Sequence, residues 1–146
     1  MRYGFDMADF LRLMYPNARF VLLTRHPGDC LASARATQRT WKLLDHVGGP
    51  AGFLAHWERT ARSFLLARDE TGALGVRFED LTRAPEEWVA RLGSFLDVSP
   101  DGFRGDVFAT RRRGWTDDEP CLTEEDMAAL ADSSVWEVAR EYGYDR

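Results

Sequence analysis

Residues 15–33 read YPNARFVLLTRHPGDCLAS, and the rest of the chain is best understood from this stretch. Its centre, RFVLLT at 19–24, places four apolar residues in a row, which predicts a strand buried on both faces. Pro27, Gly28 and Asp29 follow, and an early proline and aspartate are typical of a helix start. The stretch therefore predicts a strand-to-helix junction, whose free amide groups are suited to bind phosphate.

Arg25 stands at the predicted carboxyl end of this strand, where α/β proteins commonly place their ligands. Its guanidinium can hold a phosphate through two parallel hydrogen bonds. Ser33 lies eight residues later, about two turns into the helix, where its hydroxyl can add a donor. An ordinary strand–helix unit with a surface arginine is the alternative interpretation.

The remaining elements are predicted from apolar spacing and turn residues. They are a helix at 5–14, a long helix at 51–68, a strand at 72–77, and helices beginning near 79, 84 and 123. At the start of the long helix, HVGGPAG at 46–52 predicts a break in the helical pattern and a mobile loop. The spacing of Thr123 and Asp126 matches a capping box.

Strands separated by helices predict an α/β fold with a short parallel sheet flanked by helices. The length of 146 residues suits a single domain over residues 1–146. Because two strands make a meagre sheet, we expect either further strands or the absence of part of the domain.

Composition excludes several classes of protein. The net charge of −5 argues against a general nucleic-acid binder, and no apolar run is long enough for a membrane span. The two cysteines, Cys30 and Cys121, are too few for a disulfide scaffold and indicate free thiols. No spacing of His and Cys indicates a metal site. We therefore expect a cytoplasmic protein with no nucleic acid, membrane or metal ion as partner.

Residues 15–33 also resemble the 3′-phosphate-binding motif of sulfotransferases that use PAPS (3′-phosphoadenosine 5′-phosphosulfate). The matching positions are Tyr15, Pro16, Ala18, Arg19, the strand at 20–23, Arg25, Pro27, Asp29 and Ser33. The resemblance implies that Arg25 and Ser33 bind the 3′-phosphate of PAPS or of its product PAP. It also implies a partial P-loop-NTPase-like sulfotransferase fold, of which this chain carries the C-terminal part.

Two further segments resemble family features. Residues 77–81, RFEDL, are similar to a tyrosine-glutamate-aspartate-leucine segment whose aromatic residue lies near the adenine. Phe78 stands at that position, which implies stacking without a hydroxyl contact; an ordinary acidic helix start is the alternative. Residues 111–115 loosely resemble a late basic loop that closes over the nucleotide. That resemblance implies nucleotide contacts from Arg111, Arg112, Arg113 and Gly114, and a solvated basic loop is the alternative.

Family members also use a glycine- and lysine-containing loop for the 5′-phosphosulfate and a general base, usually His or Glu. Lys42 is the only lysine here, and no glycine-rich turn with a lysine follows a strand. His46 is the candidate base, whereas His26, next to Arg25, is more typical of a residue that tunes the phosphate site. We therefore expect the N-terminal phosphate loop to be absent and the domain to be truncated at its N-terminus relative to the family.

The resemblance implies transfer of a sulfonate from PAPS to a hydroxyl or amine of a small-molecule acceptor. The alternative is a non-catalytic module, derived from a sulfotransferase, that binds PAP, another small ligand or a partner protein. The missing loop and base favour this alternative for the isolated chain. A homodimer that completes the short sheet, or a missing N-terminal half, is compatible with both hypotheses.

Overall fold

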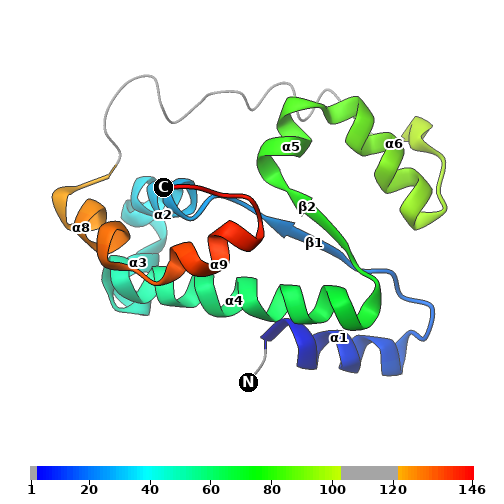
Figure 1. The fold of residues 1–146 in the computed structure, drawn as a ribbon, viewed down its shortest axis with the longest axis horizontal. Helices are drawn as coiled ribbons and strands as arrows, with labels where there is room; N and C mark the ends of the chain where they lie inside the picture. The colour runs from blue at the N-terminus through cyan, green and yellow to red at the C-terminus, as the bar shows by residue number, and fades with distance from the viewer. Residues whose placement is uncertain (1–2, 103–121) are drawn as a thin grey trace.

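A computed structural model gives the structure of the chain and describes residues 3–102 and 122–146. Helices dominate it, and they surround one short pair of strands (Figure 1). In chain order the elements are α1 (Tyr3–Met14), β1 (Val21–Thr24), α2 (Pro27–Trp41), α3 (Leu43–Val47), α4 (Gly49–Thr71), β2 (Leu74–Arg77), α5 (Phe78–Arg83), α6 (Pro85–Leu96), the 3-10 turn η1 (Pro100–Gly102), α8 (Glu124–Asp132) and α9 (Val135–Glu141).

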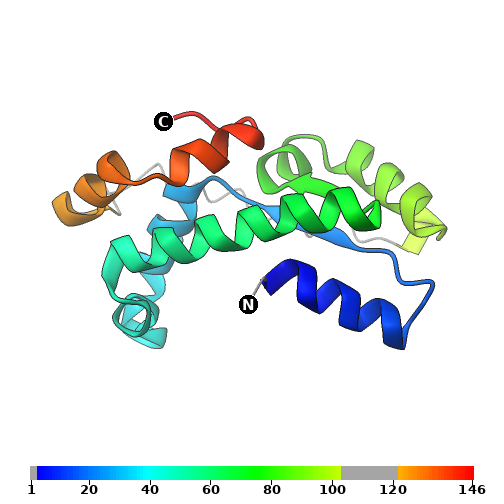
Figure 2. The same ribbon diagram turned by 60° about the horizontal axis from the view of Figure 1, so that its bottom comes forward.

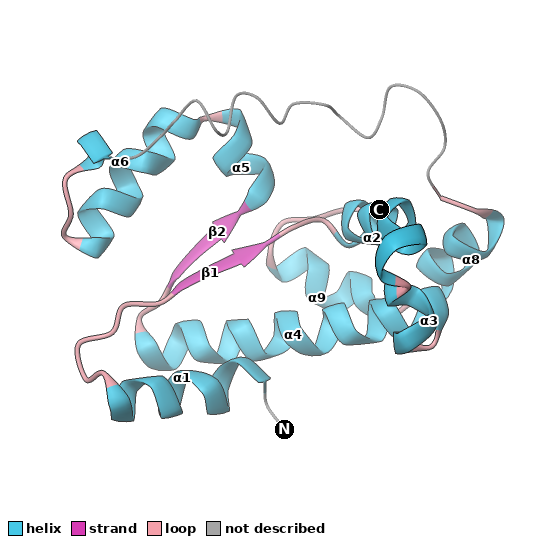
Figure 3. Ribbon diagram, turned by 180° about the vertical axis from the view of Figure 1, so that it is seen from behind, coloured by secondary structure: helices cyan, strands magenta, loops and turns pink. Residues whose placement is uncertain are grey.

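The two strands form a parallel sheet in which Val21 pairs with Leu74 and Thr24 with Arg77. Parallel strands need a long crossover, and here α2, α3 and α4 supply it. Figure 3 shows β1 and β2 side by side among these helices. The predicted α/β class, with a short parallel sheet flanked by helices, is confirmed.

The prediction that the first strand is buried on both faces is wrong for the described residues. Thr24 is 8% exposed, but Val21 and Leu23 remain 39% and 51% exposed. A continuous apolar run indicates two covered faces only if packing layers lie on both sides of the sheet. Although α4 contacts β1, no described element covers Val21 and Leu23 fully.

The longest helix, α4, is the support on which much of the molecule packs. Figure 2 shows α1 and α9 lying along it, and α3 and α8 also contact it. The hydrophobic core lies among α2, α3, α4, α8 and α9, and its buried residues are Leu31, Ala34, Leu44, Leu54, Leu130, Val135, Trp136, Ala139 and Tyr144. None of the described helices is long and apolar enough to cross a membrane.

The predicted loop at 46–52 is largely helical, so this expectation is corrected. His46 lies in the last turn of α3, and α4 begins already at Gly49. Gly48 and Gly49 have φ values of 85° and 76°, which glycine adopts without steric cost. The two glycines therefore reverse the chain within a tight turn, and α4 extends from 49 to 71 where 51–68 was predicted.

Candidate functional site

The carboxyl ends of the two strands bring together two of the predicted nucleotide-binding residues. Thr24 and Arg77 are paired in the sheet, and Arg25 and Phe78 follow them directly. The guanidinium carbon of Arg25 lies 4.7 Å from the centre of the Phe78 ring, a cation–π contact. Residues that are far apart in the sequence thus share one edge of the sheet.

The Arg25 side chain is partly exposed and pairs with Asp29. It is 24% exposed, and its Nη2 lies 3.6 Å from the Asp29 carboxylate. Its Nε is buried and has no hydrogen-bond partner in the described part of the chain, which leaves one donor unused. The Trp57 indole N–H donates to the carbonyl of Arg25 over 3.1 Å and fixes the backbone there.

Ser33 occupies the same side of α2 as the Arg25 guanidinium. Asp29 and Ser33 are four residues apart in this helix, so they lie one turn apart on one face. The Arg25 guanidinium approaches Asp29 and therefore lies on the side of α2 that carries Ser33. Ser33 is partly buried. The structure thus brings Phe78 into contact with Arg25 and places Ser33 one turn along α2 from Asp29, the ion-pair partner of Arg25.

His26 links the strand ends to the C-terminal part of the chain, residues 136–145. Its backbone N–H donates to Glu79 Oε1 over 2.8 Å, and its Nε2 lies 3.0 Å from the carbonyl of Asp145. The imidazole packs against the Trp136 and Tyr144 rings at centroid distances of 5.5 and 5.6 Å. These contacts indicate a residue that shapes the site.

Glu79 is a residue of this edge that sequence reasoning did not single out. Its carboxylate accepts one hydrogen bond from the His26 backbone and another from the Tyr144 hydroxyl, over 2.9 Å. The available signal was its position directly after Phe78 in the RFEDL segment. Nothing in that local pattern names Tyr144 as its partner, since the two are 65 residues apart.

The predicted base, His46, is not brought to this edge. His46 is exposed on α3, beyond the far end of α2. With 15 residues and about 1.5 Å per residue, α2 spans roughly 22 Å, and Arg25 lies before its other end. The predicted residues Arg111, Arg112, Arg113 and Gly114 lie outside the described residues.

Cys30 lies beside Arg25 without the properties of a nucleophile. Its Sγ is 3.8 Å from the carbonyl of Arg25, and burial raises the pKa of the thiol to about 11. The nearby Arg25 charge opposes this shift in pKa but does not cancel it. The thiol is therefore protonated at neutral pH. No group of three or more potential metal ligands occurs among the described residues.

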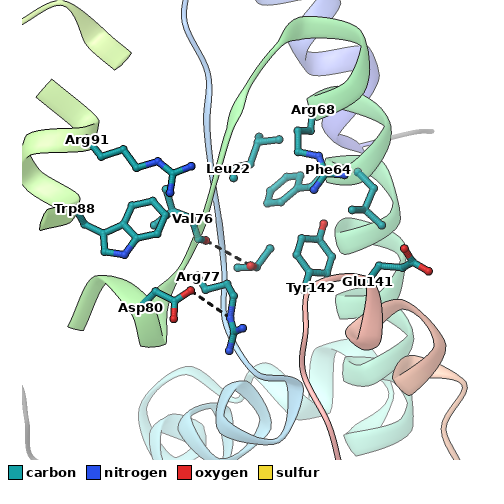
Figure 4. Close-up of a pocket in the computed structure, with 13 residues that line it drawn as sticks. Leu22, Phe64, Arg68, Val76, Arg77, Asp80, Trp88, Arg91, Glu141 and Tyr142 are labelled. Atoms are coloured by element: carbon teal, nitrogen blue, oxygen red, sulfur yellow. Dashed lines mark hydrogen bonds and ion pairs between the residues drawn. The ribbon is translucent and has the colours of Figure 1, made fainter. Parts of the chain in front are cut away.

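A hollow of about 270 Å³ adjoins the strand ends (Figure 4). Thr24 and Arg77 line it, whereas Arg25 and Phe78, each one residue later, do not. Its wall also includes Trp88, over which the Arg91 guanidinium lies at 4.6 Å. This hollow is therefore separate from the Arg25–Phe78 contact.

Comparison with known proteins gives a family match that covers both strand ends. A family model described as "Sulfotransferase family" matches residues 3–101, more than half of the chain. The matched range includes both 15–33 and 77–81, the two segments that meet at the strand ends. No curated protein and no solved structure matches the chain. On the evidence of the family match and of the parallel strand-to-helix junction within it, this chain belongs to the sulfotransferase family.

Proposed function

We propose that this chain binds the sulfonate donor PAPS, and its product PAP, at the edge formed by Arg25, Ser33 and Phe78. Arg25 and Ser33 hold the 3′-phosphate, and Phe78 packs near the adenine. The observation that carries the proposal is the contact of Arg25 with Phe78 at the carboxyl ends of two parallel strands.

The chemistry of this edge suits a phosphate. A guanidinium stacked on a ring uses its face for the ring and keeps its edge for oxygen acceptors. Arg25 makes such a contact with Phe78, and its side chain is 24% exposed. The first amide groups of α2 add donors nearby. Since the whole chain carries a charge of −5, attraction of an anion depends on such a local group.

We further propose that the donor site serves sulfonate transfer to a hydroxyl or amine of a small-molecule acceptor. The acceptor atom forms a bond to sulfur while the bond from sulfur to the phosphate oxygen of PAP breaks, and a base takes the acceptor proton. Arg25 and Ser33 position the donor and take no part in the bond changes. We also propose further nucleotide contacts from Arg111, Arg112, Arg113 and Gly114.

Calorimetric titration of PAP tests donor binding directly. We expect Arg25→Ala to weaken PAP binding by about 10- to 100-fold, because charge-assisted hydrogen bonds to the 3′-phosphate are lost. Binding of 5′-AMP, which lacks that phosphate, should change little. If the wild-type chain does not bind PAP, the proposal is wrong.

Arg91→Ala is the matched control for this titration. Arg91 stacks on Trp88 at 4.6 Å much as Arg25 stacks on Phe78, but it belongs to the separate hollow. This variant should bind PAP like the wild type. A sulfonate-transfer assay with PAPS and a phenolic acceptor then separates the two functions: binding with turnover supports the enzyme, and binding without turnover supports the non-catalytic module.

A further inference from the structure

We propose that Tyr144 is a positioning residue for the donor site, because its hydroxyl and Glu79 together hold the two strand ends that carry Arg25 and Phe78. This inference rests on the proposed function.

The Glu79 carboxylate is the central link. One oxygen accepts the backbone N–H of His26 over 2.8 Å, and the other accepts the Tyr144 hydroxyl over 2.9 Å. His26 directly follows Arg25, and Glu79 directly follows Phe78. A single carboxylate thus joins the backbone beside one ligand-binding residue to the backbone beside the other.

Tyr144 fixes this link from the C-terminal side. It is 3% exposed, and its ring lies under the Arg77 guanidinium at 4.6 Å. Its hydroxyl also lies 3.4 Å from Thr24 Oγ1. Burial raises the pKa of this hydroxyl, so it keeps its proton and serves as the donor to Glu79. The chain neighbours of both Arg25 and Phe78 are therefore in contact with one side chain.

The backbone at Gly143 allows this approach. Its φ is 75°, and a Cβ there would meet Arg77 Nη1 at 3.1 Å. A glycine at this position lets the chain leave α9 and turn Tyr144 onto the strand ends. His26 Nε2 against the carbonyl of Asp145, at 3.0 Å, adds a second tie after the tyrosine. The Tyr-Gly-Tyr sequence at 142–144 thereby has a role that its sequence pattern does not reveal.

Tyr144→Phe tests the inference, with Tyr142→Phe as matched control. The Tyr142 hydroxyl donates to the carbonyl of Ala61 over 2.7 Å, whereas the Tyr144 hydroxyl donates to Glu79. Each substitution removes one hydroxyl that donates within the fold. We expect Tyr144→Phe to weaken PAP binding about tenfold, and Tyr142→Phe to leave it unchanged. Equal PAP affinities for the two variants would overturn the inference.

Hydrogen exchange provides a readout that does not depend on the nucleotide. In Tyr144→Phe, peptides covering 21–31 and 74–82 should exchange faster, because the His26 amide and the Glu79 carboxylate lose their common support. Unchanged exchange there would contradict the inference even if the chain bound no PAP, whereas absent PAP binding with faster exchange would contradict only the proposed function. Should Tyr144→Phe not fold, Glu79→Gln replaces it, with the same expected changes and the same contrary outcomes.

Discussion

Asp126 stays ionised although its side chain is completely buried. Arg35 donates two hydrogen bonds to it, over 2.9 and 2.5 Å, and Thr123 donates to it from its backbone and hydroxyl. Burial alone would raise the pKa of Asp126, but the hydrogen bonds from Arg35 and Thr123 outweigh burial and lower it. The residue closes the predicted capping box of α8 and also ties that helix to α2.

Removing Arg35 should therefore be costly. Arg35→Ala leaves a buried carboxylate without its main partner, and we expect a loss of roughly 3 kcal/mol in the free energy of unfolding at pH 7. Urea denaturation measures this loss. Arg62→Ala is the control, since Arg62 forms an exposed pair with Glu58 and should change stability by less than about 1 kcal/mol. Similar losses in the two variants would contradict the assignment.

The same pair predicts a pH dependence. Because the folded-state pKa of Asp126 lies below its ordinary value of 3.8, its ionised form stabilises the protein above that pH. This contribution is lost as the pH falls through the folded-state pKa. The difference in stability between the wild type and Arg35→Ala should therefore shrink in acid below pH 3.8, and a constant difference would speak against this cause.

The junction between α4 and β2 depends on one glycine. Gly72 has a φ of 66°, and its N–H donates to the carbonyl of Arg68 over 3.0 Å, which ends the helix. This left-handed conformation is costly for any residue with a Cβ atom. The junction sets where β2 begins, so it also sets the register of Arg77 against Thr24.

Gly72→Ala should destabilise the protein by about 1 kcal/mol, because the added Cβ strains the backbone. Nothing lies within 4 Å of that position, so crowding plays no part. Gly75→Ala in β2 is the matched control: its φ is not in the left-handed range, the nearest atom is 3.8 Å away, and stability should hold or rise slightly. Thermal unfolding of the two variants measures the contrast, and equal melting temperatures would refute it.

On the scale of the whole molecule, the core extends beyond the range that matches the family. That match ends at residue 101, whereas α8, α9 and Tyr144 supply much of the buried apolar surface. Leu31 of α2 and Leu54 of α4 are fully buried within the cluster that these C-terminal elements complete. The C-terminal helices therefore share one hydrophobic core with α2, the helix of the strand-to-helix junction.

A chain that ends at residue 102 should therefore not fold cooperatively. It would expose Leu31 and Leu54 and lose the hydrogen bonds of Asp126 and Tyr144 to the rest of the molecule. We expect a broad, non-sigmoidal thermal transition by circular dichroism, in contrast to the full chain. A sharp transition near that of the full chain would show that the C-terminal helices are dispensable.

Much of the fold was predictable because it depends on neighbouring residues. The apolar run at 20–23, followed by Pro27 and Asp29, specifies a strand and then a helix through local periodicity and helix-start chemistry. The spacing of Thr123 to Asp126 specifies a cap in the same way. The resemblance to sulfotransferases rests on such local patterns too, and the family match confirms it.

Contacts between distant segments were not predictable, because they follow from how the elements pack together. The stacking of Arg25 on Phe78 depends on the pairing of β1 with β2, and the link from Glu79 to Tyr144 depends on the path of the chain after α9. One-sided burial of β1 and the remoteness of His46 have the same origin. Local sequence therefore determined the family and the strand-to-helix junction, whereas long-range packing alone determined which side chains meet there, since no local pattern encodes distance in space.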